Sequence, residues 1–270
     1  MKRVNGIPAL GFGTYGRWGV AGEAAILAAL ECGYRHLDTA QSYNTEGECG
    51  RAVKASGLDR DDIWITTKID MSNFAKGKLV PSLQKSCDTL DVGPVDLTLI
   101  HWPSPNGEVP LAVYLEQLAE AHDQGLTRHI GVSNFTIALL DEARAILGGH
   151  PILTNQFELN PYLSNAKLAA RCQALGIAVT AYQPIGKGRM NTDPVLSAIA
   201  ARFGIDVPQI ALAWEIAKGY VAIPTSGNPL HIRENFKALS LELTAEDIAQ
   251  IDGINRNDRH IAPSWGPAWD

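Results

Sequence analysis

The sequence predicts an α/β fold, a (β/α)8 TIM barrel, from three observations. Short β-branched segments alternate with segments of amphipathic helical spacing, which is the pattern of parallel βα units. Eight such strands can be counted, the number that closes a barrel. They recur at intervals of roughly 30 residues, the size of one βαβ repeat. Nothing interrupts this rhythm, so we expect a single domain over residues 1–270.

The candidate strands are runs of Val, Ile, Thr and aromatic residues bounded by turn-forming residues. In chain order they are Ala9–Thr14, Tyr34–Asp38, Ile63–Lys68, Val95–His101, Thr127–Val132, Leu153–Glu158, Ala178–Tyr182 and Val221–Pro224. The helices expected between and after them are Gly22–Cys32, Glu46–Ser56, Lys76–Leu90, Leu111–Gln124, Ile137–Leu147, Asn165–Leu175, Pro208–Lys218 and Leu230–Ala238. Glycine, which helix C-termini favour, follows at or near the ends of several: Gly33, Gly57, Gly125, Gly148, Gly176 and Gly219.

Two more helical segments, Pro194–Phe203 and Ala245–Ile251, exceed a minimal eightfold repeat and are predicted as additions to the barrel. The last stretch, 255–270, has no helical or strand periodicity but contains Trp265 and Trp269. It is either a frayed tail or a segment whose aromatic rings pack over something, because two tryptophans are costly to leave in water. The predicted fold includes this segment as a tail over the barrel mouth.

Composition excludes several classes of protein. There are 23 Lys+Arg against 29 Asp+Glu, a net charge of −6 that argues against nucleic acid as the main partner. No apolar signal region or membrane-length apolar stretch is present, so we expect a soluble, cytoplasmic protein with no membrane partner. Cys32, Cys49, Cys87 and Cys172 are widely separated and are interpreted as reduced thiols.

A glycine motif near the N-terminus offers a different interpretation. Residues 11–16 read Gly-Phe-Gly-Thr-Tyr-Gly and follow a predicted strand, as in the dinucleotide fingerprint of a Rossmann sheet. That fingerprint requires its third glycine to open the helix that holds the pyrophosphate, whereas residues 17–22 intervene here. We therefore interpret these glycines as a strand end and a loop, with a Rossmann-type sheet as the alternative fold.

Polar residues stand at the predicted C-terminal ends of the strands, the face that carries the active site of a (β/α)8 barrel. They are Asp38, Lys68, His101, Ser133, Asn134, Gln156, Glu158, Tyr182, Thr225 and Ser226, and Tyr43 lies on the second loop. Singly, each has an ordinary structural explanation: Asp38 as a turn cap, Lys68 reaching solvent, His101 as a hydrogen-bonded histidine beside Trp102. Jointly, an acid, a lysine and a histidine after three successive strands converge on one small volume.

These side chains suit protonation of a carbonyl oxygen. A tyrosine with an ordinary pKa of about 10 is a poor proton donor at neutral pH, but an adjacent ammonium stabilises its phenolate. Lys68 can supply that charge to Tyr43, and Asp38 can hold Lys68 protonated. His101 can donate a hydrogen bond to a substrate oxygen.

The residues resemble those of the aldo-keto reductase family over essentially the whole chain. The matching segments are 38–43 (DTAQSY), 66–68 (TTK), 99–103 (LIHWP), 131–135 (GVSNF), 155–156 (NQ) and 223–226 (IPTS). Within the family the chain looks most like bacterial 2,5-diketo-D-gluconate reductase-type members. The resemblance implies NAD(P)H-dependent reduction of an aldehyde, ketone, dicarbonyl or keto-sugar, with a catalytic tetrad of Asp38, Tyr43, Lys68 and His101.

The resemblance also implies an extended nicotinamide cofactor across the barrel mouth and no metal. Ser133, Asn134 and Gln156 would bind the carboxamide, and Tyr182 would stack on the ring. The full set of cofactor-binding residues expected is Thr14, Asp38, Ser133, Asn134, Gln156, Tyr182, Gln183, Ile185, Gly186, Lys187, Pro224, Thr225, Ser226, His231, Glu234 and Asn235. The substrate pocket would be an open aromatic cleft of Tyr15, Trp18, Trp102 and Trp265, although rim packing also explains Trp18 and Trp265.

The chain departs from the family pattern at the cofactor's 2′-phosphate. Members that prefer NADPH usually place a lysine and an arginine where this chain has Thr225 and His231. Lys187, Arg189 or Arg233 could compensate. NADPH remains the expected cofactor, with NADH possible and weak discrimination between them. The short N-terminus leaves room for only a stub where family barrels carry a hairpin.

Two other functions are compatible with parts of this pattern. Some relatives of this fold bind nicotinamide and act as regulatory subunits of a membrane channel, so a cofactor sensor with little turnover is the alternative. A metal-dependent hydrolase would need several His and carboxylate ligands at strand ends, where only His101 stands. A small-molecule carbonyl substrate and a monomeric chain are expected.

Overall fold

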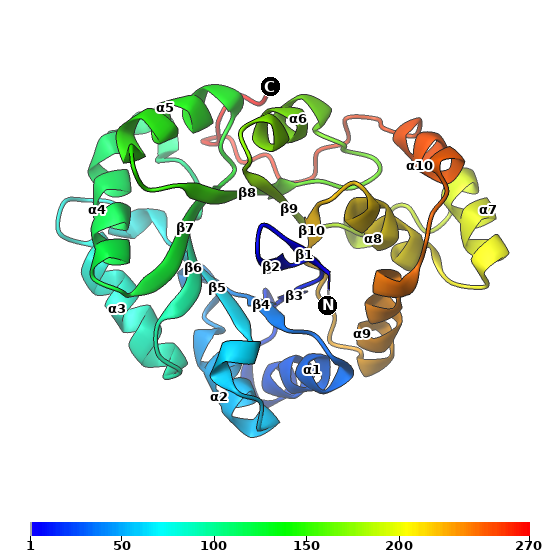
Figure 1. Ribbon diagram of the computed structural model, residues 1–270, viewed down its shortest axis with the longest axis horizontal. Coiled ribbons are helices and arrows are strands. Elements are labelled where there is room, and N and C mark those ends of the chain that lie inside the picture. Colours follow the sequence, from blue (N-terminus) through cyan, green and yellow to red (C-terminus); the bar gives the residue numbers. More distant parts are fainter. Residues whose placement is uncertain (1) are drawn as a thin grey trace.

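The computed structural model describes residues 2–270, and its strands form a ring surrounded by helices (Figure 1). The eight strands of the ring are parallel and pair in sequence order. They are β3 (Phe12–Gly13), β4 (His36–Asp38), β5 (Trp64–Ile69), β6 (Val95–Ile100), β7 (Thr127–Ser133), β8 (Ile152–Glu158), β9 (Ala178–Tyr182) and β10 (Val221–Ala222). The (β/α)8 barrel predicted from the sequence is confirmed, and the Rossmann-type sheet is excluded.

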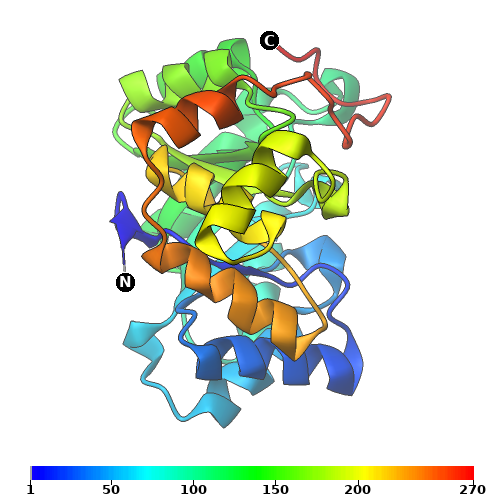
Figure 2. The same ribbon diagram turned by 90° about the vertical axis from the view of Figure 1, so that its right-hand side faces the viewer.

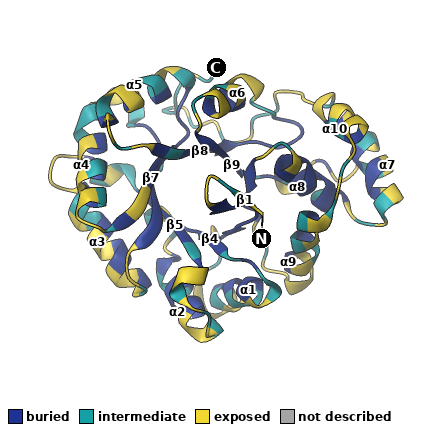
Figure 3. Ribbon diagram, in the orientation of Figure 1, coloured by how far each residue is buried: buried dark blue, intermediate teal, exposed yellow. Residues whose placement is uncertain are grey.

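Helices follow the strands and lie outside the ring. They are α1 (Gly19–Cys32), α2 (Glu46–Ser56), α3 (Leu79–Leu90), α4 (Leu111–Asp123), α5 (Ile137–Leu147), α6 (Ala166–Ala174), α7 (Pro194–Phe203), α8 (Val207–Ala217), α9 (Pro229–Phe236) and α10 (Ala245–Asp252). Helices α7 and α10 are the two predicted additions to the eightfold repeat. The six predicted C-terminal glycines all have positive φ. Figure 3 shows the helices burying their inner faces and exposing their outer ones.

The first and last strands are shorter than predicted, although they still close the barrel. The Gly11 amide donates to the carbonyl of Ala222 (2.8 Å), and the Gly13 amide donates to the carbonyl of Pro224 (2.9 Å). Pro224 has no N–H group and cannot continue the ladder as a donor. A side chain at Gly11 would lie 2.5 Å from Nδ1 of His36, so only glycine fits at this closure.

Two expectations for the N-terminal region were wrong. Helix α1 begins at Gly19 and not at Gly22. Only residues 17–18 therefore separate the glycine motif from the helix, and not the longer segment that the sequence predicts. The short N-terminus is more than a stub, because β1 (Arg3–Val4) and β2 (Ile7–Pro8) form an antiparallel hairpin. Figure 1 shows this hairpin in the middle of the ring, where the fully buried Ile7 helps to fill the barrel. Met1 lies outside the described residues.

The C-terminal tail passes over one end of the barrel beyond α10 (Figure 2). Its backbone amides at His260 and Ile261 donate to the carboxylate of Glu158, at the end of β8, over distances of 2.7–3.0 Å. Its two tryptophan rings pack edge-on against Trp102, with centroid distances of 5.3 and 6.3 Å. The tail therefore packs on the barrel mouth, as the predicted fold has it.

No single helix among residues 2–270 is long and apolar enough to span a membrane. Helices α7 and α8 pass that test only as a pair, by length and composition, with a bend of 92° between them. The four cysteines predicted as thiols are free.

Candidate active site

A buried ion pair forms the floor of the candidate site. Asp38 ends β4 and Lys68 lies near the end of β5, so the parallel register places their side chains side by side. Lys68 Nζ donates to Asp38 Oδ1 at 2.5 Å and to the carbonyl of Thr39 at 3.0 Å. Gln156 Nε2, from β8, donates to the other oxygen of Asp38 at 2.8 Å. Both charged groups are almost fully buried, so the pair depends on these hydrogen bonds.

Tyr43 lies above this pair, in the short helical turn that follows β4. Its Oη is 3.4 Å from Lys68 Nζ and 3.5 Å from His101 Nε2. The ammonium of Lys68 also lies 4.8 Å from the centre of the tyrosine ring. The sequence prediction that Asp38, Tyr43, Lys68 and His101 converge is therefore confirmed in geometry.

The pKa values of this cluster follow from burial and from the buried pair. Burial works to lower the pKa of Lys68, but Asp38 and Tyr43 outweigh it, so the pKa is raised and the lysine stays charged. Burial raises the pKa of Tyr43, and Lys68 lowers it only in part. Lys68 lowers the pKa of Tyr43 as the sequence predicts, but the expectation of a net lowering is wrong. Burial removes water from the phenolate, and the ammonium of Lys68 makes up for only part of that loss.

His101 is held as a neutral imidazole. Burial, and secondarily the charge of Lys68, lowers its pKa to about 3. Its Nδ1 lies 3.3 Å from Oγ of Ser42. If the serine hydroxyl donates to Nδ1, the proton of the ring resides on Nε2, the nitrogen that faces Tyr43. The neutral ring can then act as a hydrogen-bond donor.

A cavity of about 420 Å³ opens above Tyr43 and His101 at the carboxyl ends of the strands. It contains these predicted residues: Thr14, Tyr15, Asp38, Tyr43, His101, Trp102, Ser133, Asn134, Gln156, Tyr182, Gln183, Ile185, Lys187, Pro224 and Thr225. Lys68 lies beneath the cavity and does not line it. Tyr182 Oη donates to Asn134 Oδ1 at 2.8 Å, and Asn134 Nδ2 donates to the carbonyl of His101 at 3.0 Å, which links the ends of β6, β7 and β9.

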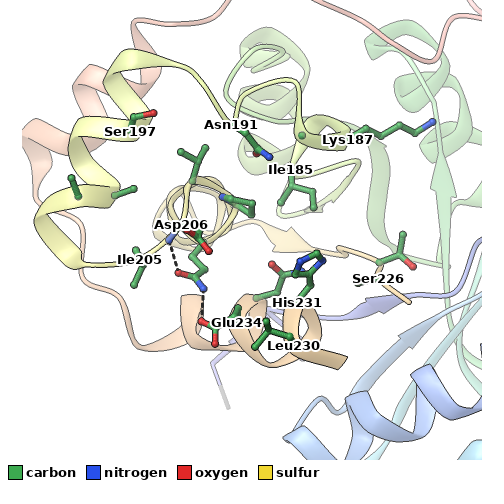
Figure 4. Close-up of a pocket in the computed structure, with 18 residues that line it drawn as sticks. Ile185, Lys187, Asn191, Ser197, Ile205, Asp206, Ser226, Leu230, His231 and Glu234 are labelled. Carbon is green, nitrogen blue, oxygen red and sulfur yellow. Dashed lines mark hydrogen bonds between the residues drawn. The ribbon is translucent and has the colours of Figure 1, made fainter. Parts of the chain in front are cut away.

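A second cavity, of about 740 Å³, continues from the first toward α9 (Figure 4). The two cavities share Ile185, Lys187 and Thr225. Four more predicted cofactor residues line the second cavity: Ser226, His231, Glu234 and Asn235. Together the cavities form one continuous path along the barrel mouth.

The path suits an extended dinucleotide. Its inner end combines hydroxyl and amide side chains with the ring of Tyr182, and Gln183 Oε1 is buried there without a hydrogen-bond partner. Its outer end is open and polar, with Lys187 between the two cavities. The residues present therefore fit a nicotinamide at the inner end and an adenosine at the outer end.

Several predicted site residues occupy other places. Glu158 holds the tail and does not line either cavity. Trp18 is 58% exposed, and its indole N–H donates to the carbonyl of Tyr43 at 2.7 Å. Trp265 supports Trp102 from outside the cavity. Gly186 is buried within the loop after β9 and lines neither cavity.

Sequence reasoning missed the far wall of the outer cavity. That wall comes from the loop before α7, from α7 and α8 and from their connection, and includes Asn191, Ser197, Ala200, Asp206 and Gln209. Gln209 Nε2 donates to Glu234 Oε2 at 2.9 Å, a contact visible in Figure 4. It also missed Ile261, which brings the tail to the inner cavity. No motif marked these positions; the only signal was the extra helix in the repeat.

The cations considered as substitutes near the adenosine end are not equivalent. Arg189 forms an ion pair with Asp258, with 2.7 Å between its guanidinium nitrogen and the carboxylate oxygen. Arg233 does not line the cavity, whereas Lys187 does. Of these three side chains, Lys187 is the one that lines the cavities, and its Nζ lies 3.4 Å from His260 Nε2.

A phenol between a buried ammonium and a neutral imidazole, at the mouth of a (β/α)8 barrel, is the arrangement of an acid–base enzyme. The profile of the Aldo/keto reductase family matches residues 10–256, and the chain belongs to that family. It is accordingly an oxidoreductase of a family that uses NAD(P)H.

The relatives cover nearly the whole chain. Methylglyoxal reductase DkgB of Escherichia coli O157:H7 is 44% identical over 265 residues, which is 98% of this chain and 99% of the relative. The 2,5-diketo-D-gluconic acid reductase B of a Corynebacterium species is 37% identical and covers 91% and 88%. The solved structure of an aldose reductase from Giardia lamblia superposes with a TM-score of 0.87 at 33% identity, covering 94% of each chain.

Proposed function

We propose that this chain uses NADPH to reduce the carbonyl of a small 2-oxoaldehyde, dicarbonyl or keto-sugar to an alcohol, with Tyr43 as the proton donor. The observation that carries the proposal is the position of Tyr43 Oη, 3.4 Å from Lys68 Nζ and 3.5 Å from His101 Nε2. Tyr43 and His101 line the cavity in which a carbonyl oxygen would accept a proton, and Lys68 lies beneath it, against Tyr43 Oη. The alternative of a cofactor sensor does not call for this arrangement.

The proton passes from Tyr43 Oη to the carbonyl oxygen. The phenolate that remains is stabilised by the ammonium of Lys68, which Asp38 keeps protonated at 2.5 Å. Because the pKa of Tyr43 is raised by burial, the hydroxyl is fully protonated at neutral pH and ready to donate. The cost of forming the phenolate is offset only if Lys68 is charged at that moment.

His101 positions the carbonyl. Its neutral ring, with the proton on Nε2, donates a hydrogen bond to the substrate oxygen without competing as an acid. Ser42 is a positioning residue for that ring, since its hydroxyl lies against Nδ1.

A bound reduced nicotinamide supplies the hydride. Asn134, Ser133 and Gln156 are the residues that would hold its carboxamide, and the ring of Tyr182 would lie against its plane. The residues of the outer cavity, including Thr225, Ser226, His231, Glu234 and Asn235, would hold the adenosine end. Lys187 and Thr225, which border both cavities, would lie beside the phosphates.

The wall of the inner cavity favours compact, partly polar substrates. Tyr15 and Trp102 provide aromatic surface, and the tail residue Ile261 narrows the opening. Two of the relatives are named for the reduction of methylglyoxal and of a diketogluconic acid. Each of these compounds carries more than one carbonyl group. Methylglyoxal is therefore the first substrate to test.

The preference for NADPH is weak in this proposal. Thr225 and His231 provide neither a fixed ammonium nor a guanidinium fork for the 2′-phosphate, and Lys187, the nearest of the three cations considered, would lie beside the other phosphates.

The test is consumption of NADPH and of NADH by the purified chain, measured at 340 nm with methylglyoxal, a diketo-sugar acid, aliphatic aldehydes and cyclic ketones. We expect both cofactors to be consumed, NADPH modestly faster, and methylglyoxal to rank first. If both cofactors bind but neither is consumed with any carbonyl, the proposal is wrong and the sensor role is favoured.

A further inference from the structure

Three side chains that can ligate a metal lie together on the side of the barrel away from the mouth. His122 and Asp123 end α4, shortly before β7 begins, and His150 lies two residues before the start of β8. The starts of the strands mark the amino-terminal face of the barrel, opposite the candidate active site. This group is therefore separate from the residues proposed for carbonyl reduction.

The ligand atoms of this group lie close to the separations found around one metal ion. Asp123 Oδ1 lies 3.3 Å from His122 Nδ1 and 2.8 Å from His150 Nε2, and all the ligand atoms lie within 4.8 Å of one another. Tetrahedral zinc with bonds of about 2.0–2.2 Å separates its ligand atoms by about 3.3–3.5 Å. Small rotations of two imidazoles would bring the three atoms to these separations.

The ring of His150 is already oriented for ligation. Its Nδ1 faces the carbonyl of Leu147 at 3.4 Å, and its Nε2 faces Asp123. Because the carboxylate can only accept, Nε2 carries the proton that it donates to Asp123, and a bound ion would take the place of that proton. A backbone carbonyl on the other nitrogen is a usual support of a metal-bound histidine. Both imidazoles are partly shielded, with side chains 35% and 29% exposed.

The surroundings favour a cation. Asp123 and His150 lie in a depression between α4 and α5 that also contains the carboxylates of Glu116 and Glu120. No Lys or Arg is among the described residues that line it. The depression therefore carries a negative local charge, and it is open enough to leave a coordination position for water.

We propose that His122, Asp123 and His150 form a binding site for a divalent ion of the zinc class, with water as the remaining ligand. Two imidazoles and one carboxylate are a ligand set that zinc accepts and that magnesium and calcium disfavour. The ion would join the end of α4 to the connection between α5 and β8. Its binding would stabilise the folded chain, because the unfolded chain does not hold these ligands together.

The experiment is a titration of the chelator-treated chain with Zn²⁺, followed by calorimetry, and with Co²⁺, whose visible absorption reports tetrahedral coordination. We expect one saturable equivalent of zinc and a rise of the melting temperature with zinc concentration. His150→Gln and His122→Gln should each weaken zinc binding at least about tenfold. His129→Gln is the matched control, because His129 lies at the same face, stacked on Trp64 and outside the group.

Three results would overturn the proposal: no saturable binding, equal binding by the wild type and both variants, or loss of binding in His129→Gln as well. If His150→Gln is unfolded by circular dichroism, His122→Gln and Asp123→Asn decide the question, since neither touches the Leu147 contact. NADPH consumption in these variants should match the wild type, which separates failure at this site from failure of the proposed reductase function.

Discussion

The cluster beneath Tyr43 and the outer cavity beside α9 lie along the same barrel mouth but are built in opposite ways. In the cluster, the charged groups are buried, and the contacts join residues at the ends of β4, β5 and β8 and in the loops after β4 and β6. In the outer cavity, the side chains come from helices and connections, and His231 and Ser226 are accessible to solvent. Buried charges allow little variation, whereas an open polar wall can change without loss of the fold. Chemistry should therefore depend on the cluster and cofactor choice on the outer cavity.

The largest expected effect is that of Lys68→Met. This change leaves Asp38 buried without its cation, so we expect a loss of about 3–5 kcal/mol in the free energy of unfolding. It also removes the ammonium beside Tyr43, so we expect kcat for methylglyoxal to fall by about 10²–10⁴-fold. Urea unfolding and steady-state kinetics measure the two effects.

The double variant Asp38→Asn/Lys68→Met separates stability from chemistry. With both charges removed, most of the stability should return while activity stays low. Recovery of activity in the double variant would show that the charge of Lys68 has no part in the reaction.

The cluster could be predicted from the sequence because strand ends define it. Asp38, Lys68 and His101 each lie within one residue of the end of a strand, and parallel strands bring their carboxyl ends to one face. The sequence could not reveal the balance of burial and charge at Tyr43, because that depends on how completely the loops exclude water. The net rise of the tyrosine pKa was therefore missed.

The next effect is a decrease in the free energy of unfolding at acidic pH, which arises from His36 near Asp38. Burial lowers the pKa of His36 to about 4, below its ordinary 6.5, despite the nearby charge of Asp38. As the pH falls, His36 of the unfolded chain therefore takes up a proton before His36 of the folded chain does. The free energy of unfolding is unaffected by His36 well above pH 6.5 and decreases as the pH falls from there toward 4. Linkage gives a loss of about 2 kcal/mol between pH 7.5 and pH 5 from this residue.

Urea unfolding at both pH values, in the wild type and in His36→Leu, measures this loss. The wild type should lose about 2 kcal/mol more than the variant between the two pH values. An identical pH dependence in both proteins would mean that His36 is not held neutral in the barrel.

The smallest expected effect concerns the outer cavity. Thr225→Lys with His231→Arg adds two cations where the 2′-phosphate is proposed to lie. We expect the ratio of KM values to shift toward NADPH by about tenfold or more, as for a new hydrogen bond to a charged group. The value of kcat should stay the same, because neither residue contacts the cluster.

Unchanged KM values for both cofactors in this double variant would place the 2′-phosphate elsewhere. A large fall in kcat would contradict the separation of the two regions.

The outer cavity is also where sequence reasoning was least complete. Asn191, Ser197 and Gln209 belong to α7, α8 and the loop before them, and no motif connects them to the strand ends. Trp18 was placed in the substrate pocket because it is aromatic and near Tyr15, yet its indole N–H bonds the carbonyl of Tyr43 and its ring faces outward. Strand periodicity predicts which residues share a face, but it does not predict where a loop side chain turns.

The most direct test of the account is Tyr43→Phe, measured for both NADPH binding and methylglyoxal reduction. The phenyl ring keeps the packing against Tyr15 but removes the hydroxyl between Lys68 and His101. We expect the dissociation constant for NADPH, followed by quenching of tryptophan fluorescence, to stay within about twofold of the wild type, while kcat falls by about 10²-fold or more. Reduction at the wild-type rate in Tyr43→Phe would contradict the assignment of Tyr43 as the proton donor.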